Sequence, residues 1–147
     1  RQRQMCIRDR TNGVIAIGKE FINENDYKNC ARDFILKHYN FNSGNVLFKP
    51  TFTSEKIFRN NFEDALSYFV KGHIDEDSGF AIKNWKSIKF ENYKIIEHND
   101  SSLAMGNYFF EDESGQLLKV EYTFGFVKIN NDEIRINLHH SSLPYND

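Results

Sequence analysis

The sequence predicts an α+β domain in which three helices come first and a curved antiparallel sheet follows. Apolar residues recur at three- and four-residue steps between residues 12 and 70, whereas from Ile82 onward they recur at every second position. This segregated order of helices and strands is typical of α+β domains. The chain of 147 residues suits one domain, and its 14 Phe residues supply wide side chains for a core between helices and sheet.

The first ten residues, RQRQMCIRDR, resemble a translated sequencing adapter. They lack the apolar run that a secretory signal requires, and their periodicity fits neither a helix nor a strand. We therefore predict that residues 1–10 are a non-native leader and that residues 11–147 form a single domain. Because this interpretation removes the native start, it leaves the compartment unassigned, with periplasmic or plastid targeting as open alternatives.

The charge balance argues against nucleic acid as a partner. The formal net charge is −2, and the leader holds four Arg and one Asp, which leaves 15 basic and 20 acidic side chains elsewhere. Proteins that bind nucleic acid need clustered basic side chains to neutralise phosphates. No apolar run approaches the roughly 18 residues of a membrane-spanning helix, so a membrane is not an expected partner either.

Capping residues delimit the predicted helices. Side chains of Asn and Asp favour the first position of a helix because their oxygens accept hydrogen bonds from its free N–H groups. The expected helices are 12–22, 27–39 and 62–70, capped by Asn12, by Asp26, and by Asn60 or Asn61.

Two hydroxyl side chains lie where the pattern gives them a defined direction. Pro50 fixes its own φ and keeps Lys49 extended, so Thr51 leaves an apolar segment along a set path. Tyr68 falls at the edge of the apolar stripe of the third helix. A tyrosine at such an edge can bury its ring and hold its hydroxyl at the mouth of a cavity.

The loop of residues 72–79 is acidic, with Asp75, Glu76 and Asp77 in succession. Its spacing lacks the order of ligands found in a calcium-binding loop. We interpret it as a solvated surface turn.

The second half of the chain predicts an antiparallel meander. Gly125 lies inside the longest strand, where a glycine is typical of a β-bulge. Polar residues within these strands are expected to pair with each other across strands or to face an oligomer interface. The expected strands are 85–91, 93–98, 102–111, 117–129 and 133–141, and the polar positions are Asn107, Glu121, Thr123 and Arg135.

The last strand ends in two imidazoles and two hydroxyls, His139-His140-Ser141-Ser142. Its apolar alternation, Ile134, Ile136 and Leu138, continues into His140 and Ser142, while His139 and Ser141 fall on the opposite face. If the apolar face is buried, His140 and Ser142 reach the rim of a cavity, where His140 could accept or donate a proton. The alternative is a strand end whose side chains only hydrogen-bond with their neighbours.

Five blocks of the sequence together resemble the iota-class carbonic anhydrases, over essentially all of residues 12–145. They are VLFKPT (46–51), ALSYF (65–69), MGNYF (105–109), KVEYTFG (119–125) and LHHSSLPY (138–145). The resemblance implies the cone-shaped α+β fold shared by nuclear transport factor 2, SnoaL and the calmodulin-kinase association domain, and a homodimer formed through the outer face of the sheet. It also implies the carbonate dehydratase (lyase) reaction, the reversible hydration of CO2 to bicarbonate, with bicarbonate held by hydroxyls.

The same resemblance implies a set of site residues. Thr51, Tyr68 and one serine of the last block, Ser141 or Ser142, match the hydroxyls that bind and orient the substrate. We expect His140 to be the proton acceptor. Phe48 and Asn107 are further expected substrate-binding residues.

No metal is expected as a cofactor. The histidines are scattered, with no His-x-His pair and no Cys-rich spacing typical of zinc sites. Manganese or zinc is the alternative, with the histidines and Glu121 as the ligands it would use.

Two other function classes remain open at this point, because one fold hosts many functions. A pocket lined by Phe48, Phe69, Phe109 and Phe124 would suit a small apolar ligand. A closed cone filled by side chains would suit an oligomerisation domain without chemistry.

Overall fold

The computed structural model describes residues 2–131 and 133–146, with side chains described from Cys6 onward. Arg1, Asp132 and Asp147 therefore lie outside the described residues, and with them one end of the predicted leader and one end of the predicted domain. The elements are α1 (Gln2–Ile22), α2 (Tyr27–His38), the 3-10 turn η1 (Asn40–Asn42), β1 (Leu47–Lys49), α3 (Phe62–Val70), the 3-10 turn η2 (Phe80–Ile82), β2 (Ser87–Glu97), β3 (Ser101–Glu111), β4 (Leu117–Asn130) and β5 (Glu133–Ser142).

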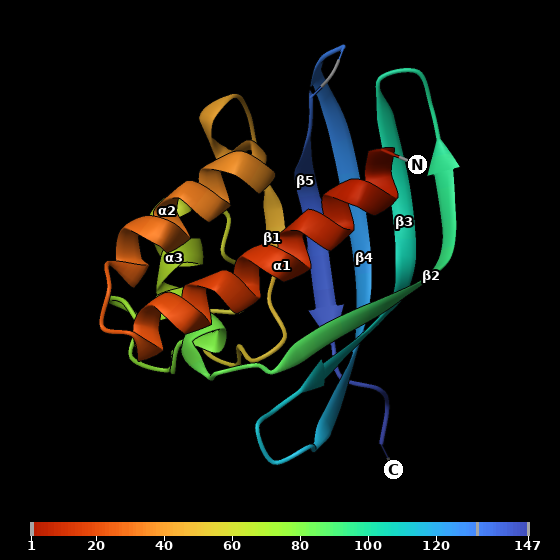
Figure 1. The fold of residues 1–147 in the computed structure, drawn as a ribbon. Coiled ribbons are helices and arrows are strands. Elements are labelled where there is room, and N and C mark those ends of the chain that lie inside the picture. The colour runs from red at the N-terminus through yellow and green to blue at the C-terminus, as the bar shows by residue number, and fades with distance from the viewer. Residues whose placement is uncertain (1, 132, 147) are drawn as a thin grey trace.

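Three helices cover one face of a five-stranded sheet, as Figure 1 shows, so the predicted α+β class is confirmed. The strand order is β1-β5-β4-β3-β2, and strands β2 to β5 form the predicted antiparallel meander. The short strand β1, which the sequence did not predict as a strand, pairs parallel with β5 and sets Phe48 beside His139. This pairing brings the segment before Thr51 next to the end of the chain.

Strand β2 is continuous, whereas two strands were predicted over the same residues. Its pairing with β3 shifts register between Asn92 and Lys94 and then continues. The Glu91-Asn92 pair has the composition of a turn, but a bulge accommodates it without ending the strand. The prediction of a hairpin at this point was wrong.

Helix α1 begins ten residues before the predicted start at Asn12. Ile7, Val14 and Ile17 are at most 1% exposed, and their seven- and three-residue spacing places them on one face against the core. Arg10 is also buried, with 5% of its surface exposed. The origin of residues 1–10 as a sequencing adapter stays a prediction, because their place in a helix does not test it.

The caps of the other two helices agree with the prediction. The carboxylate of Asp26 accepts a hydrogen bond from the Asn29 amide, and the side chain of Asn61 accepts one from the Asp64 amide. Helix α3 ends at Lys71, which adopts the left-handed conformation with φ of 63°. Glycine favours that conformation, yet here the glycine, Gly72, comes one residue later.

The core lies between the helices and the sheet and consists largely of aromatic rings. The largest fully buried aromatic side chains are Tyr39, Phe48, Phe69, Tyr108, Tyr122, Phe124 and Phe126.

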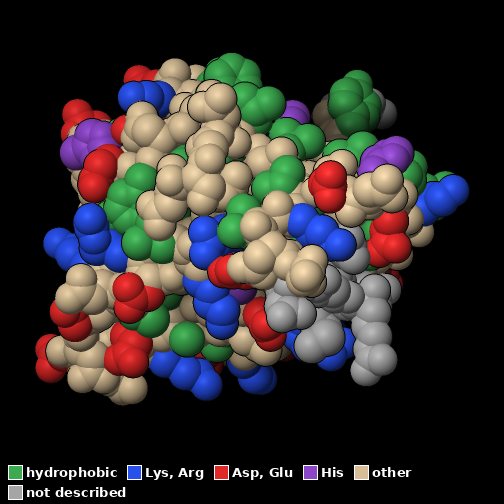
Figure 2. Space-filling view, turned by 90° about the horizontal axis from the view of Figure 1, so that it is seen from above, with side chains coloured by type: hydrophobic (Ala, Val, Ile, Leu, Met, Phe, Trp, Pro, Cys, Tyr) green, Lys and Arg blue, Asp and Glu red, His purple; other side chains and the backbone are tan. Residues whose placement is uncertain are grey.

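The surface carries both signs of charge. Figure 2 shows acidic and basic side chains interspersed over the face seen from above. Among the described residues, no helix is at once long and apolar enough to span a membrane.

A bulge in β5 reverses which of its side chains face the core. Ile136 pairs with Phe126 but Leu138 pairs with Gly125, so Asn137 is an extra residue in β5. A Cβ added to Gly125 would lie 2.8 Å from the Asn137 side chain and 2.9 Å from Leu138, so this position requires glycine. A bulge therefore lies opposite Gly125, but its extra residue belongs to β5 and not to the strand of Gly125 as predicted, and beyond it the alternation of β5 changes face.

Candidate active site

A small chamber lies inside the cone, between α3, the end of β5 and the segment that follows β1. Its volume is about 10 Å³, which is room for about one water molecule. Aromatic rings supply most of the wall, and the polar groups come from distant parts of the chain. The polar lining residues are Arg10, Thr51, Tyr68, His139 and Ser141, and the lining rings include Phe48, Phe69, Phe80 and Phe110.

The structure brings three of the predicted hydroxyls together. Thr51, Tyr68 and Ser141 all line the chamber, and Phe48 forms part of its wall. The Tyr68 ring stacks on Phe80 with 5.7 Å between ring centroids, and its hydroxyl accepts a hydrogen bond from the amide of the residue after Thr51. Burial raises the pKa of Tyr68 above its ordinary value, so the phenol keeps its proton and can donate it in a hydrogen bond.

The histidine in the chamber is His139. Its ring lies between two phenyl rings, with centroids 5.0 Å from Phe48 and 4.4 Å from Phe124. Only 2% of the residue is exposed. Burial lowers the pKa of His139 well below its ordinary value, and the nearby charge of Arg10 lowers it further. The imidazole is therefore neutral at physiological pH.

A chain of hydrogen bonds runs through His139. The Arg10 Nε donates to the Tyr39 hydroxyl at 2.9 Å. That hydroxyl lies 2.7 Å from His139 Nδ1, and His139 Nε2 lies 2.8 Å from the Ser141 hydroxyl. A neutral imidazole has one donor and one acceptor nitrogen, so the ring can pass a proton between the two hydroxyls by changing its tautomer.

Arg10 brings a positive charge to the chamber wall. Its guanidinium donates hydrogen bonds to the phenol oxygens of Tyr39 and Tyr108, which carry no charge. The guanidinium also lies 5.5 Å from the centroid of the Phe124 ring. A buried cation is stabilised by an anion beside it, so the chamber favours a negatively charged ligand.

The comparison with protein families matches nearly the whole chain. The family model described as "Metal-independent carbonic anhydrase" matches residues 5–143, and this match begins inside the predicted leader. The chain belongs to the metal-independent carbonic anhydrase family. A curated member of that name from Nostoc sp. (strain PCC 7120) is 37% identical over 121 residues, which cover 80% of this chain. The match spans only 59% of that relative's length.

Solved structures agree with this family. The iota-carbonic anhydrase from a cyanobacterium complexed with bicarbonate has a TM-score of 0.95 and 31% identity, covering 99% of this chain and 92% of that chain. A calcium/calmodulin-dependent protein kinase II association domain from Xanthomonas campestris has a TM-score of 0.64 and 17% identity, covering 96% and 84%. The second likeness shows the fold alone and confirms the predicted cone architecture.

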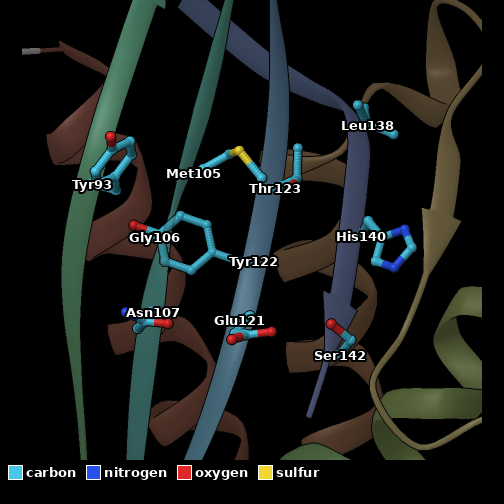
Figure 3. A pocket seen from close by; sticks show the side chains of 10 residues that line it. All are labelled: Tyr93, Met105, Gly106, Asn107, Glu121, Tyr122, Thr123, Leu138, His140 and Ser142. Carbon is cyan, nitrogen blue, oxygen red and sulfur yellow. The ribbon is translucent and has the colours of Figure 1, made fainter. Parts of the chain in front are cut away.

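Three predicted site residues of this carbonic anhydrase family member lie outside the chamber. Asn107, His140 and Ser142 line a groove of about 740 Å³ on the outer face of the sheet (Figure 3). The expectation that His140 and Ser142 face the cavity was wrong, because the extra residue Asn137 reverses the alternation. Asn107 pairs with Glu121 across β3 and β4 on this outer face, as predicted for the polar strand residues.

The four-phenylalanine pocket of the alternative ligand-binding interpretation does not form. Phe109 pairs with Lys119 on the outer face of the sheet, whereas its neighbour Phe110 lines the chamber. Strand β3 alternates strictly at this point, so adjacent residues face opposite sides. With a chamber as small as this, an elongated apolar ligand has no room.

The sequence did not single out His139, Tyr39 or Arg10 as site residues. The local pattern of β5 gave no signal for His139, because the extra residue Asn137 that turns it inward is defined only by the pairing with β4. Tyr39 was predicted only as part of an apolar helix face. Arg10 was set aside with the leader.

The described residues contain no group of three or more His, Cys, Asp or Glu side chains that could hold a metal ion. His73, for example, contacts the Asp64 carboxylate at 3.0 Å on the surface, and Lys56 contacts the same carboxylate at 2.8 Å. The family name, metal-independent carbonic anhydrase, agrees with the expectation that no metal is obligatory.

Proposed function

We propose that this chain catalyses the reversible hydration of carbon dioxide to bicarbonate in the inner chamber, without an obligatory metal. The observation that carries the proposal is the joined set of hydroxyls, neutral imidazole and buried guanidinium in one chamber walled by rings. The membership of the metal-independent carbonic anhydrase family supports this reaction. The similar cyanobacterial iota-carbonic anhydrase is complexed with bicarbonate, which supports the ligand.

The chamber suits both sides of this reaction. Carbon dioxide is small and uncharged, and phenyl walls such as Phe48 and Phe69 suit it. Bicarbonate is an anion with several acceptor oxygens. The hydroxyls of Thr51 and Tyr68 can donate hydrogen bonds to these oxygens, and the positive charge of Arg10 attracts the anion. Because the chamber holds about 10 Å³, either molecule can be admitted only when lining side chains shift outward.

The hydrogen-bond chain supplies a route for the proton that water loses. In the tautomer with a proton on Nδ1, His139 accepts at Nε2 the hydroxyl proton of Ser141. Ser141 then takes a proton from the water whose oxygen bonds to the carbon of CO2. The products are bicarbonate and a protonated His139, and the bicarbonate charge offsets the unfavourable burial of that cation. In this proposal His139 takes the role that the sequence gave to His140, and Ser141 is the one of the two serines between which the sequence left the choice open.

Hydration assays on chelator-treated protein test the proposal. We expect the stripped protein to hydrate carbon dioxide faster than buffer in a stopped-flow assay, and added manganese or zinc to change the rate little. Thr51→Ala and Tyr68→Phe should each lower kcat/KM by about tenfold, because each removes one donor aimed at the substrate. A stripped protein that equals buffer would refute the metal-free reaction, and recovery with metal would make the histidines and Glu121 the candidate ligands.

We also propose that the chain forms a homodimer through the outer face of the sheet. Leu103, Met105 and Tyr93 expose 46%, 56% and 84% of their surface there. Contiguous apolar side chains on a sheet face are typical of a protein interface. The groove that contains Met105 and Tyr93 is the centre of this proposed interface.

A further inference from the structure

Thr51 lies on a long loop with little regular structure of its own. We call residues 50–59 the Thr51 loop. Its two ends are closed by hydrogen bonds, from the Arg59 amide to the Phe48 carbonyl at 2.7 Å and from the Phe48 amide to the Asn60 side chain at 3.0 Å. The segment from Pro50 to Asn61 contains neither helix nor strand. Within the loop the Thr53 hydroxyl donates to the Ile57 carbonyl at 3.1 Å, and contacts from outside add to this, because loops without internal ladders sample many conformations.

Glu76 holds the tip of the Thr51 loop. One carboxylate oxygen accepts from the Ser54 amide at 2.8 Å, and the other accepts from the Lys56 amide at 2.8 Å. The Glu55 amide between them lies 3.2 Å from the second oxygen. These contacts lower the pKa of Glu76 to about 2, so it remains ionised at working pH. A single carboxylate thus fixes three successive backbone amides.

Asp77 holds the end of the same loop and ties it to α3. It accepts two hydrogen bonds from the fully buried Arg59 guanidinium, at 2.8 and 2.7 Å. It also accepts one from the Ser67 hydroxyl at 2.7 Å. Ser67 directly precedes Tyr68 on α3, so Asp77 joins the loop that carries Thr51 to the helix that carries Tyr68.

The acidic loop is therefore not the solvated turn that the sequence predicted. Asp77 is buried, with 4% of its surface exposed, while Asp75 remains exposed. The loop covers Arg59, and a buried guanidinium requires a carboxylate partner.

We propose that Glu76 and Asp77 are positioning residues for carbon dioxide hydration: they hold the Thr51 loop against α3 and so set the spacing between the Thr51 and Tyr68 hydroxyls. This inference rests on the function proposed above. The loop already touches the tyrosine directly, since the Phe52 amide donates to the Tyr68 hydroxyl at 3.3 Å. Movement of the loop tip would change the positions of both hydroxyls at once.

Glu76 is the better residue to change, because Asp77→Asn would weaken the closer ion pair of buried Arg59, at 2.7 and 2.8 Å, and would disturb folding, whereas Glu76 lies 3.5 Å from that guanidinium. In the full chain we expect Glu76→Ala to lower kcat for hydration roughly tenfold to a hundredfold, the effect of misplacing a group by about 1 Å. KM should change less than about twofold, because the phenyl walls that accept carbon dioxide stay in place. Asp75→Ala is the matched control, since it removes the same charge one residue away and should leave kcat unchanged.

Chemical rescue of the Glu76→Ala variant distinguishes a positioning role of Glu76 from a general loss of structure. Formate is a carboxylate small enough to occupy the place of the missing Glu76 carboxylate. Added formate should restore part of kcat in Glu76→Ala and none in Thr51→Ala. Glu76→Ala should also cause a smaller loss of kcat in a Thr51→Ala background than in the parent chain, because part of its effect acts through Thr51. A Glu76→Ala variant with full kcat, or a fully additive double variant, would overturn the inference.

Amide hydrogen exchange tests the positioning without using activity. Exchange at Phe52, Ser54 and Lys56 should be faster in Glu76→Ala than in the parent chain, and unchanged in Asp75→Ala. Equal exchange in Glu76→Ala and the parent would overturn the inference even if the parent is active. If the parent chain hydrates carbon dioxide no faster than buffer, the proposed function fails, and the exchange result alone then decides the positioning claim.

Discussion

The two faces of β5 carry the same residue types in different surroundings. His139 and Ser141 point into the chamber, and His140 and Ser142 point into the outer groove. The inner pair is 2% and 3% exposed, whereas His140 is exposed and Ser142 is half-buried. Adjacent identical side chains therefore differ in their surroundings because of the face on which they lie, and we propose different roles for them.

The difference is chemical as well as geometric. On the inner face, the His139 ring is held between Tyr39 and Ser141 by hydrogen bonds at both nitrogens. On the outer face, His140 pairs with Thr123, and Ser142 pairs with Glu121. Only the inner pair is joined to a buried cation and to other hydroxyls, so only the inner pair can both bind an anion and move a proton.

The serines give the largest expected contrast. Ser141→Ala should lower kcat/KM for hydration by about a hundredfold to a thousandfold, because it removes a donor that also passes the proton. Ser142→Ala should change kcat/KM by less than about twofold, because its hydroxyl faces the outer groove. Stopped-flow assays of both variants measure the contrast, and equal effects would show that the face of β5 does not decide the role.

The histidines give the next contrast. His139→Gln should lower kcat by about tenfold to a hundredfold, since an amide cannot accept and release a proton as imidazole does. His140→Gln should retain nearly all activity. Unfolding midpoints of both variants serve as the control for folding, and a larger loss of kcat in His140→Gln would reverse the assignment.

A substitution on the outer face of the sheet should affect dimer assembly and not catalysis. Met105→Glu places a charge among the exposed apolar side chains and should raise the dimer dissociation constant at least about tenfold, because burying an unpaired charge is unfavourable. Sedimentation equilibrium measures this constant. Asn25→Glu, in the exposed turn after α1, is the control and should leave assembly unchanged. A parent chain that is monomeric at all concentrations would rule out the proposed dimer.

The inner imidazole, that of His139, should also make the free energy of unfolding depend on pH. Burial lowers the pKa of His139 well below its ordinary value and that of His38 to about 4. As the pH is lowered, each histidine is protonated in the unfolded state at a higher pH than in the folded state. The free energy of unfolding is therefore at its full value above about pH 6.5 and decreases as the pH falls below it.

Between pH 6.5 and 5, the free energy of unfolding should fall by roughly 1 kcal/mol per pH unit for each of these two histidines. Urea unfolding at several pH values measures the slope. His38→Gln should remove about half of it. A slope that this variant leaves unchanged would show that His38 does not contribute to the pH dependence of stability in this range.

Much of the fold followed from local pattern. The caps at Asp26 and Asn61 and the order of helices before strands were predicted because each depends on residues close in sequence. Segments that are long and regular are the most predictable for the same reason. The continuous β2 and the early start of α1 were missed, because a bulge and a buried helix face depend on what packs opposite them.

The candidate site was only partly predictable. Thr51 and Tyr68 came from sequence blocks shared with a family, and the structure places both in the chamber. Ser141 and Ser142 stayed unresolved, and His140 was chosen over His139, because strict alternation was extended through the bulge. Glu76 and Asp77 were interpreted as solvated, because a local acidic run gives no information about a distant arginine.

The sequence by itself determined the order of helices before strands, the caps of α2 and α3, the resemblance to a family and the supply of hydroxyls, because these follow from periodicity, capping and local motifs. The tertiary structure alone decided which imidazole and which serine face inward, because one extra residue in β5 is defined only by its pairing with β4. It also decided the roles of Arg10, Glu76 and Asp77, because burial of a charge depends on partners that the chain brings together only on folding.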